Sequence, residues 1–205
     1  PSVGNYIYGT GNDALWVNLY IGSEATCNVK KHDVQVKMET EMPWQGTARL
    51  TFGSSMKGQL RLRIPQWAEK FRVSVNGQSV KYKEDHGYAV ISRSWKKGDA
   101  VSVEMPMGVR LLEADPRVKE DVGQRAVQRG PLIYCAEEVD NPQHFAEIAI
   151  SPATQWTDRY VQKLQGIVEL KANENGRTFT FIPYYAWDNR LPGEMRVWMP
   201  WKAGQ

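Results

Sequence analysis

Apolar and polar side chains alternate along most of this chain. The alternation is clear in four segments, 15–21, 34–39, 48–52 and 60–64. Because successive side chains of a β-strand point to opposite faces, a period of two predicts strands with one buried and one solvated face. Pro65 closes the fourth segment, since proline cannot donate to a β-ladder. These segments predict antiparallel sheets with a single buried side.

Turn signals separate the predicted strands at regular intervals. Asn76-Gly77 is a strong hairpin signal because both residues tolerate a positive φ, and Lys97-Gly98-Asp99 marks another turn. A spacing of about 8–12 residues between turns is typical of β-sandwiches and barrels. No segment has the pattern of a long amphipathic helix, and Tyr6-Ile7-Tyr8 near the N-terminus is predicted as strand.

A second block of strands begins near Met105. Its predicted strands carry the same β-branched and aromatic bias as those of the first block. They cover residues 109–112, 125–128, 132–136, 148–150, 166–170, 178–182 and 195–199. We therefore predict an all-β protein made of two tandem antiparallel β-sandwich, jelly-roll-like domains, residues 1–107 and 108–205.

Composition and charge exclude several classes of protein. Aromatic residues make up 11% of the 205 residues and charged residues 24%, which excludes a disordered chain. No apolar run approaches the roughly 18 residues of a membrane-spanning helix. The net charge is +3 with Lys and Arg scattered along the chain, so we expect no nucleic-acid partner. The chain opens on Pro1 without an initiator Met, and we expect a fragment of a longer polypeptide.

Metal-ligating and nucleophilic residues are few and far apart. The histidines are His32, His86 and His144, and the thiols are Cys27 and Cys135. None shows the short spacings that bring ligands to one metal ion, so we predict no metal site and no bound cofactor in this chain. Cys135 lies in an apolar strand, where burial raises the pKa of a thiol and lowers its reactivity.

The densest acidic groups are Glu137-Glu138 with Asp140, and Glu113 with Asp115. Glycosidases need two carboxyl groups about 5–10 Å apart, but neighbouring residues of a strand face opposite sides. We therefore predict that these carboxylates are turn and surface charges, and we assign no catalytic residue.

Arg61 and Arg63 share one face of their predicted strand. We expect them to pair with acids such as Glu39 and Glu41 on a neighbouring strand, with a weaker alternative in which they bind a sugar acid. Exposed cross-strand pairs of this kind contribute about 0.2–1 kcal/mol.

Eight tryptophans are many for this length. Flat, exposed indole rings stack on sugars, whereas most Trp side chains in sandwiches fill a core or a seam between domains. Trp67, just after Pro65, and Trp187, beside Asn189 and Arg190, are the best candidates for a surface. We predict that Trp67, Trp187, Asn189 and Arg190 contact either carbohydrate or another domain.

Several motifs in fixed order resemble one known family. They are distributed over nearly the whole chain. They include residues 15–21 (LWVNLYI), 43–46 (PWQG), 60–68 (LRLRIPQWA), 75–77 (VNG), 128–135 (QRGPLIYC), 183–190 (PYYAWDNR) and 195–198 (MRVW). The chain is similar to the C-terminal part of the β-L-arabinofuranosidases, glycoside hydrolase family 127, with Asp188 where that family is expected to have a small residue.

The resemblance implies where the chemistry of the family resides. Its members begin with a large (α/α)6 barrel that carries the cysteine nucleophile, the acid/base and a zinc ion held by a Glu and three Cys. Residues 1–107 then correspond to the middle domain and 108–205 to the C-terminal domain. Cys27 and Cys135 do not match the paired cysteines of the barrel. The resemblance thus implies zinc in another part of the polypeptide and no catalytic residue here.

Three functions follow from this reading. The first is a non-catalytic region that braces the (α/α)6 barrel of a bacterial glycoside hydrolase acting on arabinose-containing glycans. The alternatives are an independent carbohydrate-binding module and a protein–protein interaction domain. The corresponding partners are the N-terminal barrel of the same polypeptide, carbohydrate, or a second copy of the chain. Neither a membrane span nor a cellular location is assigned.

Overall fold

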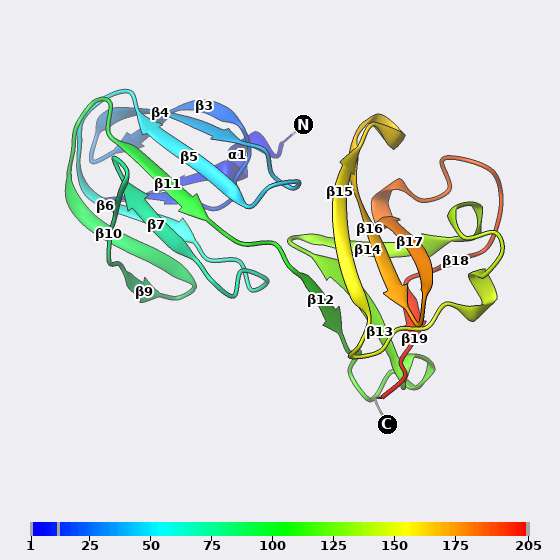
Figure 1. Cartoon of the computed structure of the whole chain (residues 1–205). Coiled ribbons are helices and arrows are strands. Elements are labelled where there is room, and N and C mark those ends of the chain that lie inside the picture. Colours follow the sequence, from blue (N-terminus) through cyan, green and yellow to red (C-terminus); the bar gives the residue numbers. More distant parts are fainter. Residues whose placement is uncertain (1, 12, 204–205) are drawn as a thin grey trace. The chain divides into compact units, whose positions relative to one another are not determined.

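The computed structural model describes residues 2–11 and 13–203, which form two compact units. Unit 1 is Pro1–Met107 and unit 2 is Gly108–Gln205 (Figure 1). Strands account for about half of the described residues, and the α-helix found among them, α1 (Gly4–Ile7), has four residues. The predicted all-β class is therefore confirmed. No helix of the described residues is long and apolar enough to cross a membrane.

Unit 1 is a sandwich of two sheets. One sheet has the strand order β1-β2-β6-β10-β9 and the other β3-β4-β5-β11-β7-β8. Neighbouring strands are antiparallel except β2 and β6, which pair in parallel. The bounds are β1 (Tyr8–Thr10), β2 (Ala14–Val17), β3 (Ser23–Val29), β4 (His32–Thr40), β5 (Thr47–Phe52), β6 (Met56–Arg63), β7 (Arg72–Val75), β8 (Gln78–Ser79), β9 (Lys83–Asp85), β10 (Tyr88–Trp95) and β11 (Ala100–Glu104).

The core of unit 1 follows the alternation of its sequence. In β4, Val34, Val36 and Met38 are buried while the residues between them are exposed. The rings of Phe52 and Trp95 stack between the sheets with centroids 4.8 Å apart and planes inclined by 17°. Burial of such apolar surface, at roughly 25 cal/mol per Å2, holds the two sheets together.

The prediction of a strand at Tyr6-Ile7-Tyr8 is wrong for the first two residues. Helix α1 ends at Ile7, and β1 begins at Tyr8. The N–H of Tyr6 donates to the carbonyl of Val3, and the carbonyl of Ile7 accepts from the N–H of Asn18. Tyr6 is exposed while Ile7 is buried. A strand with alternating faces would also bury Ile7 and expose Tyr6, so the burial pattern does not distinguish the strand from this helical turn.

Unit 2 is a branched antiparallel sheet. Its strand order is β12-β13-β14-β17-β16-β15, with β18 paired to β14 and β19 to β13. The bounds are β12 (Val109–Leu112), β13 (Gln124–Arg129), β14 (Leu132–Glu137), β15 (Gln155–Val161), β16 (Ile167–Glu174), β17 (Arg177–Pro183), β18 (Met195–Arg196) and β19 (Trp198–Pro200). Short 3-10 turns connect them: η1 (Lys119–Asp121), η2 (Glu138–Asp140), η3 (Phe145–Glu147), η4 (Lys163–Gln165) and η5 (Tyr184–Ala186).

The central strands of unit 2 differ from the predicted pattern. Strand β16 is buried at six of its eight positions and β17 at its last five, so both faces are covered and the expectation of one buried side fails here. The predicted strand 148–150 is also wrong. Ile150 makes one isolated bridge to Trp201, between η3 and β15, which is too short a pairing to form a strand.

Candidate functional site

The largest group of exposed aromatic side chains in unit 2 follows β17. We call residues 184–191 the aromatic loop. Tyr184 is 43% exposed, Tyr185 58%, Trp187 40% and Leu191 72%. Tyr184 and Trp187 stand parallel, with ring centroids 6.3 Å apart and planes inclined by 2°. Pro183 ends β17, and η5 then brings these two rings to the same side because the N–H of Trp187 donates to the carbonyl of Tyr184 at 3.2 Å.

Asn189 and Asp188 fix the backbone of the aromatic loop. The side-chain amide of Asn189 donates to the carbonyls of Ala186 at 3.2 Å and Trp187 at 3.0 Å. Asp188 has a φ of 57°, a left-handed conformation that Asp tolerates better than most residues. A small residue such as glycine fits this conformation without strain, which gives a physical reason for the small residue expected there in the family.

Arg190 anchors the aromatic loop to the body of unit 2. Its guanidinium donates to Asp140 Oδ1 at 2.6 Å and also to Glu137 Oε2. The backbone N–H of Asp188 donates to Glu137 Oε1 at 3.0 Å. The prediction that Glu137 and Asp140 are surface charges is therefore wrong. Both side chains lie almost wholly inside unit 2, where η2 folds the second carboxylate back toward the first.

The ionic cluster extends beyond Arg190. Lys163 contacts Asp140 and lies 3.5 Å from Glu169, and Lys171 lies 3.0 Å from Glu169. Burial raises the pKa of Asp140, but hydrogen bonds from Arg190 and Lys163 outweigh that effect and hold the pKa below its usual range. The hydrogen bond to Asp140 likewise raises the pKa of Arg190. All of these charges are therefore compensated within the cluster.

This arrangement determines what the two carboxylates can do chemically. A general acid needs a raised pKa so that it carries a proton near neutral pH. Asp140 has the opposite shift, and the oxygens of Glu137 are engaged by Arg190 and by the backbone of Asp188. The cluster binds the loop to the sheet, and Asp140 within it lacks the raised pKa that a general acid needs.

The two thiols are buried and form no disulfide. Burial, with a further contribution from Glu137, raises the pKa of Cys135 to about 12, and burial also raises the pKa of Cys27. Both therefore stay protonated near neutral pH, as predicted for Cys135. His86 contacts Asp85 at 2.6 Å and His144 contacts Glu147 at 3.3 Å.

The four predicted contact residues fall in two separate units. Trp67 follows β6 in unit 1 and is half-buried against the core of that unit. Trp187, Asn189 and Arg190 all belong to the aromatic loop of unit 2. That any of them touches carbohydrate or another domain remains a prediction. Sequence reasoning missed the exposed Tyr185 and Leu191, although the run 183–190 that it singled out contains the first of them.

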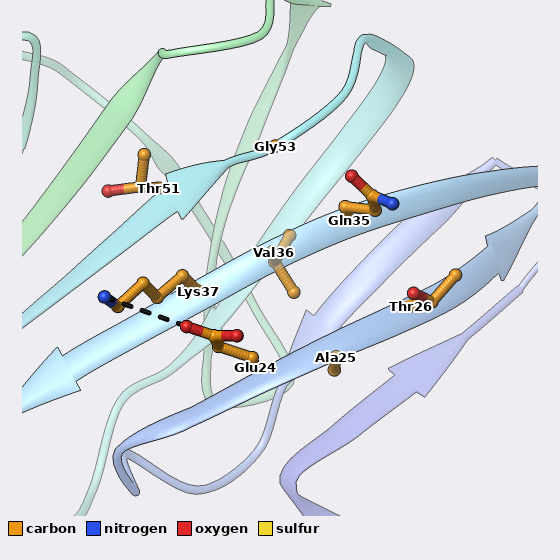
Figure 2. A pocket seen from close by; sticks show the side chains of 8 residues that line it. All are labelled: Glu24, Ala25, Thr26, Gln35, Val36, Lys37, Thr51 and Gly53. Carbon is orange, nitrogen blue, oxygen red and sulfur yellow. Dashed lines mark ion pairs between the residues drawn. The ribbon is translucent and has the colours of Figure 1, made fainter.

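Unit 1 also has a shallow concave surface on the outer face of β3, β4 and β5 (Figure 2). Glu24 and Lys37 form an exposed ion pair across it at 3.7 Å, and the neighbouring Gln35 and Thr51 are polar (Figure 2). The residues lining it include no aromatic ring and no second carboxylate. It lacks both a platform for a sugar ring and a catalytic pair.

The prediction that Arg61 and Arg63 pair with Glu39 and Glu41 fails for Arg61. Arg61 donates to Asp85 of β9 at 2.9 Å and lies over the ring of Trp16. Both partners belong to the same sheet as β6, whereas β4, which carries Glu39, lies in the opposite sheet. The order of strands in the sheet determines that Arg61 pairs with Asp85, and the alternation of apolar and polar residues does not predict that order.

Two family models and several known proteins match this chain. The beta-L-arabinofuranosidase GH127 middle domain matches residues 14–107, and the glycoside hydrolase family 127 C-terminal domain matches residues 109–200. A non-reducing end beta-L-arabinofuranosidase of Bifidobacterium longum subsp. longum is 29% identical over 96% of this chain.

Two solved structures share the fold at higher identity. A GH127 β-L-arabinofuranosidase of Geobacillus stearothermophilus T6 superposes with a TM-score of 0.90 at 37% identity, and a GH127 β-arabinofuranosidase with 0.92 at 34%; each covers 98% of this chain. This chain spans 34% of the Bifidobacterium longum protein and 36% and 37% of the two solved chains, about a third of each. The order of its motifs, its two all-β units and these matches together show that the chain belongs to glycoside hydrolase family 127 and corresponds to the family's middle and C-terminal domains.

Proposed function

We propose that this chain is the non-catalytic β-sandwich region of a larger glycoside hydrolase that acts on arabinose-containing glycans. One observation carries the proposal: nearly the whole chain matches the family's middle and C-terminal domains, and it spans about a third of relatives named as arabinofuranosidases. The catalytic groups of the polypeptide then lie in the portion of the relatives that this chain does not span.

The chemistry of the described residues supports this division. Cys135 is buried with a pKa near 12, so it is a poor nucleophile, and Glu137 and Asp140 are neutralised by Arg190. The residues present do not fit a zinc site either, since no three metal-ligating side chains converge in 2–11 and 13–203. Zinc, if the parent enzyme uses it, is held by residues outside this chain.

The role that we propose for the two units is to brace the catalytic domain of the same polypeptide. The aromatic loop supports this role, because Tyr184, Tyr185, Trp187 and Leu191 are all exposed within eight residues, and an exposed apolar patch marks an interaction surface. Arg190 and Asn189 hold the loop in one conformation, so little conformational entropy is lost when it is covered.

Turnover of an aryl β-L-arabinofuranoside by the purified chain tests the assignment. We expect no hydrolysis above the buffer rate, with or without added zinc. Hydrolysis that disappears in Cys135→Ser and persists in Cys27→Ser would place the chemistry in this chain and overturn the proposal. Cys27 is the matched control because it is a second buried thiol in the other unit.

Sedimentation velocity tests the proposed contact surface. The isolated chain should self-associate as its concentration rises, and Tyr185→Ser with Leu191→Ser should abolish the association. A chain that stays monomeric at every concentration would argue against an uncovered interface.

A second candidate, an independent carbohydrate-binding module, is favoured by the parallel rings of Tyr184 and Trp187. Parallel exposed rings can stack on successive sugars. Titration with arabino-oligosaccharides, followed by tryptophan fluorescence, should then give saturable quenching that Trp187→Ala removes. Unchanged fluorescence at millimolar sugar would exclude this candidate.

A further inference from the structure

A cleft lies at one end of the unit 1 sandwich, and no residue of the aromatic loop contributes to it. Both sheets contribute to it: the β3–β4 turn and the start of β4 from one, and the start of β6 and the end of β10 from the other. Its volume is about 630 Å3, within the usual range for small-molecule sites. Buried Val34, Met56 and Trp95 form its floor, and the rim is polar.

The β3–β4 turn at the rim has an unusual backbone. Lys30 and Lys31 link Val29 to His32 in a two-residue hairpin, with φ of 51° and 63°. Hairpins with two left-handed residues normally use Asn-Gly or a similar pair, since a left-handed conformation costs roughly 1–2 kcal/mol for an ordinary residue. The three other turns of this kind in the described residues each place glycine second: Asn76-Gly77, His86-Gly87 and Asn175-Gly176.

Two lysines are therefore held at this turn against the preference of the backbone. Strain of this sort concentrates at functional sites, and here it coincides with the cleft. Lys30 lines the cleft from one sheet and Lys57 lines it from the other. Neither ammonium group is in an ion pair with any carboxylate of residues 2–11 or 13–203.

The remaining rim groups suit hydroxyl groups better than a second negative charge. Ser55 and Ser94 supply hydroxyls, and His32 also lines the cleft. The hydroxyl of Ser54 already accepts from the N–H of Gln35 at 2.9 Å and donates to the carbonyl of Asp33 at 3.3 Å. Asp33 also lines the cleft, and its carboxylate accepts from the side-chain amide of Asn28 at 2.9 Å. This carboxylate can accept from a ligand hydroxyl, and it repels a multiply charged anion such as phosphate more strongly than a singly charged carboxylate.

We propose that this cleft binds a singly charged acidic sugar, with its carboxylate held between Lys30 and Lys57 and its hydroxyls on Ser55, Ser94 and Asp33. The ligand class is a uronic acid residue, free or at the end of a glycan. The proposal does not rest on the bracing role or on any activity of the parent enzyme, because every group in it belongs to unit 1 of this chain.

Glucuronate and glucose make a matched pair of probes, because glucuronate carries a carboxylate where glucose carries a hydroxymethyl group. Amide chemical shifts of the 15N-labelled chain should respond saturably to millimolar glucuronate at Ser54, Ser55 and Lys57. Glucose should give no comparable shifts. Raising NaCl from about 50 mM to about 500 mM should weaken glucuronate binding, because salt screens an ammonium–carboxylate pair.

Replacing the two lysines of the β3–β4 turn should raise the stability of unit 1 and weaken its binding of glucuronate. Lys30→Asn with Lys31→Gly creates an Asn-Gly turn, so the melting temperature of unit 1 should rise by about 4 °C or more. The same variant and Lys57→Gln should each weaken glucuronate binding by about tenfold or more, the order expected for one charge-assisted hydrogen bond. Lys81→Gln, an exposed lysine outside the cleft, is the matched control and should bind as the parent chain does.

Three results would overturn the proposal. The first is equal binding of glucuronate and glucose. The second is inorganic phosphate shifting the same amides as strongly as glucuronate, which would indicate a non-specific anion surface. The third is an Asn-Gly variant that is stabilised and still binds glucuronate like the parent.

Discussion

The guanidinium of Arg190 donates to Asp140 Oδ1 at 2.6 Å, across fifty residues of chain. The same guanidinium reaches Glu137, at the end of β14, so one cation neutralises two carboxylates inside unit 2. The aromatic loop is held in place by this contact. Its loss should therefore affect stability and the shape of the exposed surface together.

Arg190→Met should destabilise unit 2 strongly. Removing one partner of a buried ion pair costs about 3–5 kcal/mol, because it leaves the other charges buried without compensation. Urea denaturation of the chain measures the change. Arg72→Met is the control, since Arg72 and Glu104 form an exposed pair that should contribute less than about 1 kcal/mol. Equal effects of the two changes would show that the Arg190 cluster is not buried in solution.

Acid should weaken the same cluster. The pKa of Asp140 is lowered in the folded chain by Arg190 and Lys163, against the effect of burial. Its contribution to stability is therefore complete above the unfolded value of about 4 and is lost as pH falls through the lower folded value. Urea denaturation between pH 7 and pH 3, compared with Asp140→Asn, isolates this contribution. The difference between the two proteins should shrink as pH falls, and a constant difference would contradict the lowered pKa.

Both thiols should resist modification. Burial raises the pKa of Cys27 and Cys135, so little thiolate exists near neutral pH and reagent cannot reach either sulfur. Reaction with a chromogenic disulfide at pH 8 should be slow for the folded chain and should release two equivalents in denaturant. Rapid reaction of one thiol in the folded chain would identify an exposed cysteine, and Cys135→Ser would show which one it is.

Gly46→Ala should destabilise unit 1. A Cβ at Gly46 would lie 1.8 Å from the carbonyl oxygen of Met105, and that residue's N–H donates to the carbonyl of Gly46 at 2.7 Å. The backbone segments at Gly46 and Met105 must move apart, which should lower the free energy of unfolding by about 2–4 kcal/mol. Thermal unfolding measures the loss. Gly22→Ala is the control, since its Cβ would meet nothing closer than 3.9 Å, and a comparable loss in that variant would contradict the close approach at Gly46.

Much of the fold could be predicted from the sequence because strand formation is signalled locally. Val34, Val36 and Met38 alternate with polar residues, and the structure buries those three. The hairpin at Asn76-Gly77 also forms as predicted. The helical turn at Gly4–Ile7 was missed because so short an element has no period to detect.

The candidate site was predicted less completely. Trp187, Asn189 and Arg190 were singled out together because they adjoin in sequence, and they do form one loop. The exposure of Tyr185 and Leu191 was not foreseen, since neither residue type signals exposure. Glu137 was expected at the surface because carboxylates usually lie there. Its partner Arg190 is 53 residues away in the sequence, so no local pattern indicates that the two side chains meet.

The sequence by itself determined that this chain is all-β and which family it resembles, because alternation and turn residues act over neighbouring positions. Only the tertiary structure decided which charges meet: Arg190 with Glu137 and Asp140, and Arg61 with Asp85. Such pairs depend on the order in which strands join a sheet, and that order is set by packing of whole faces rather than by any local run of residues.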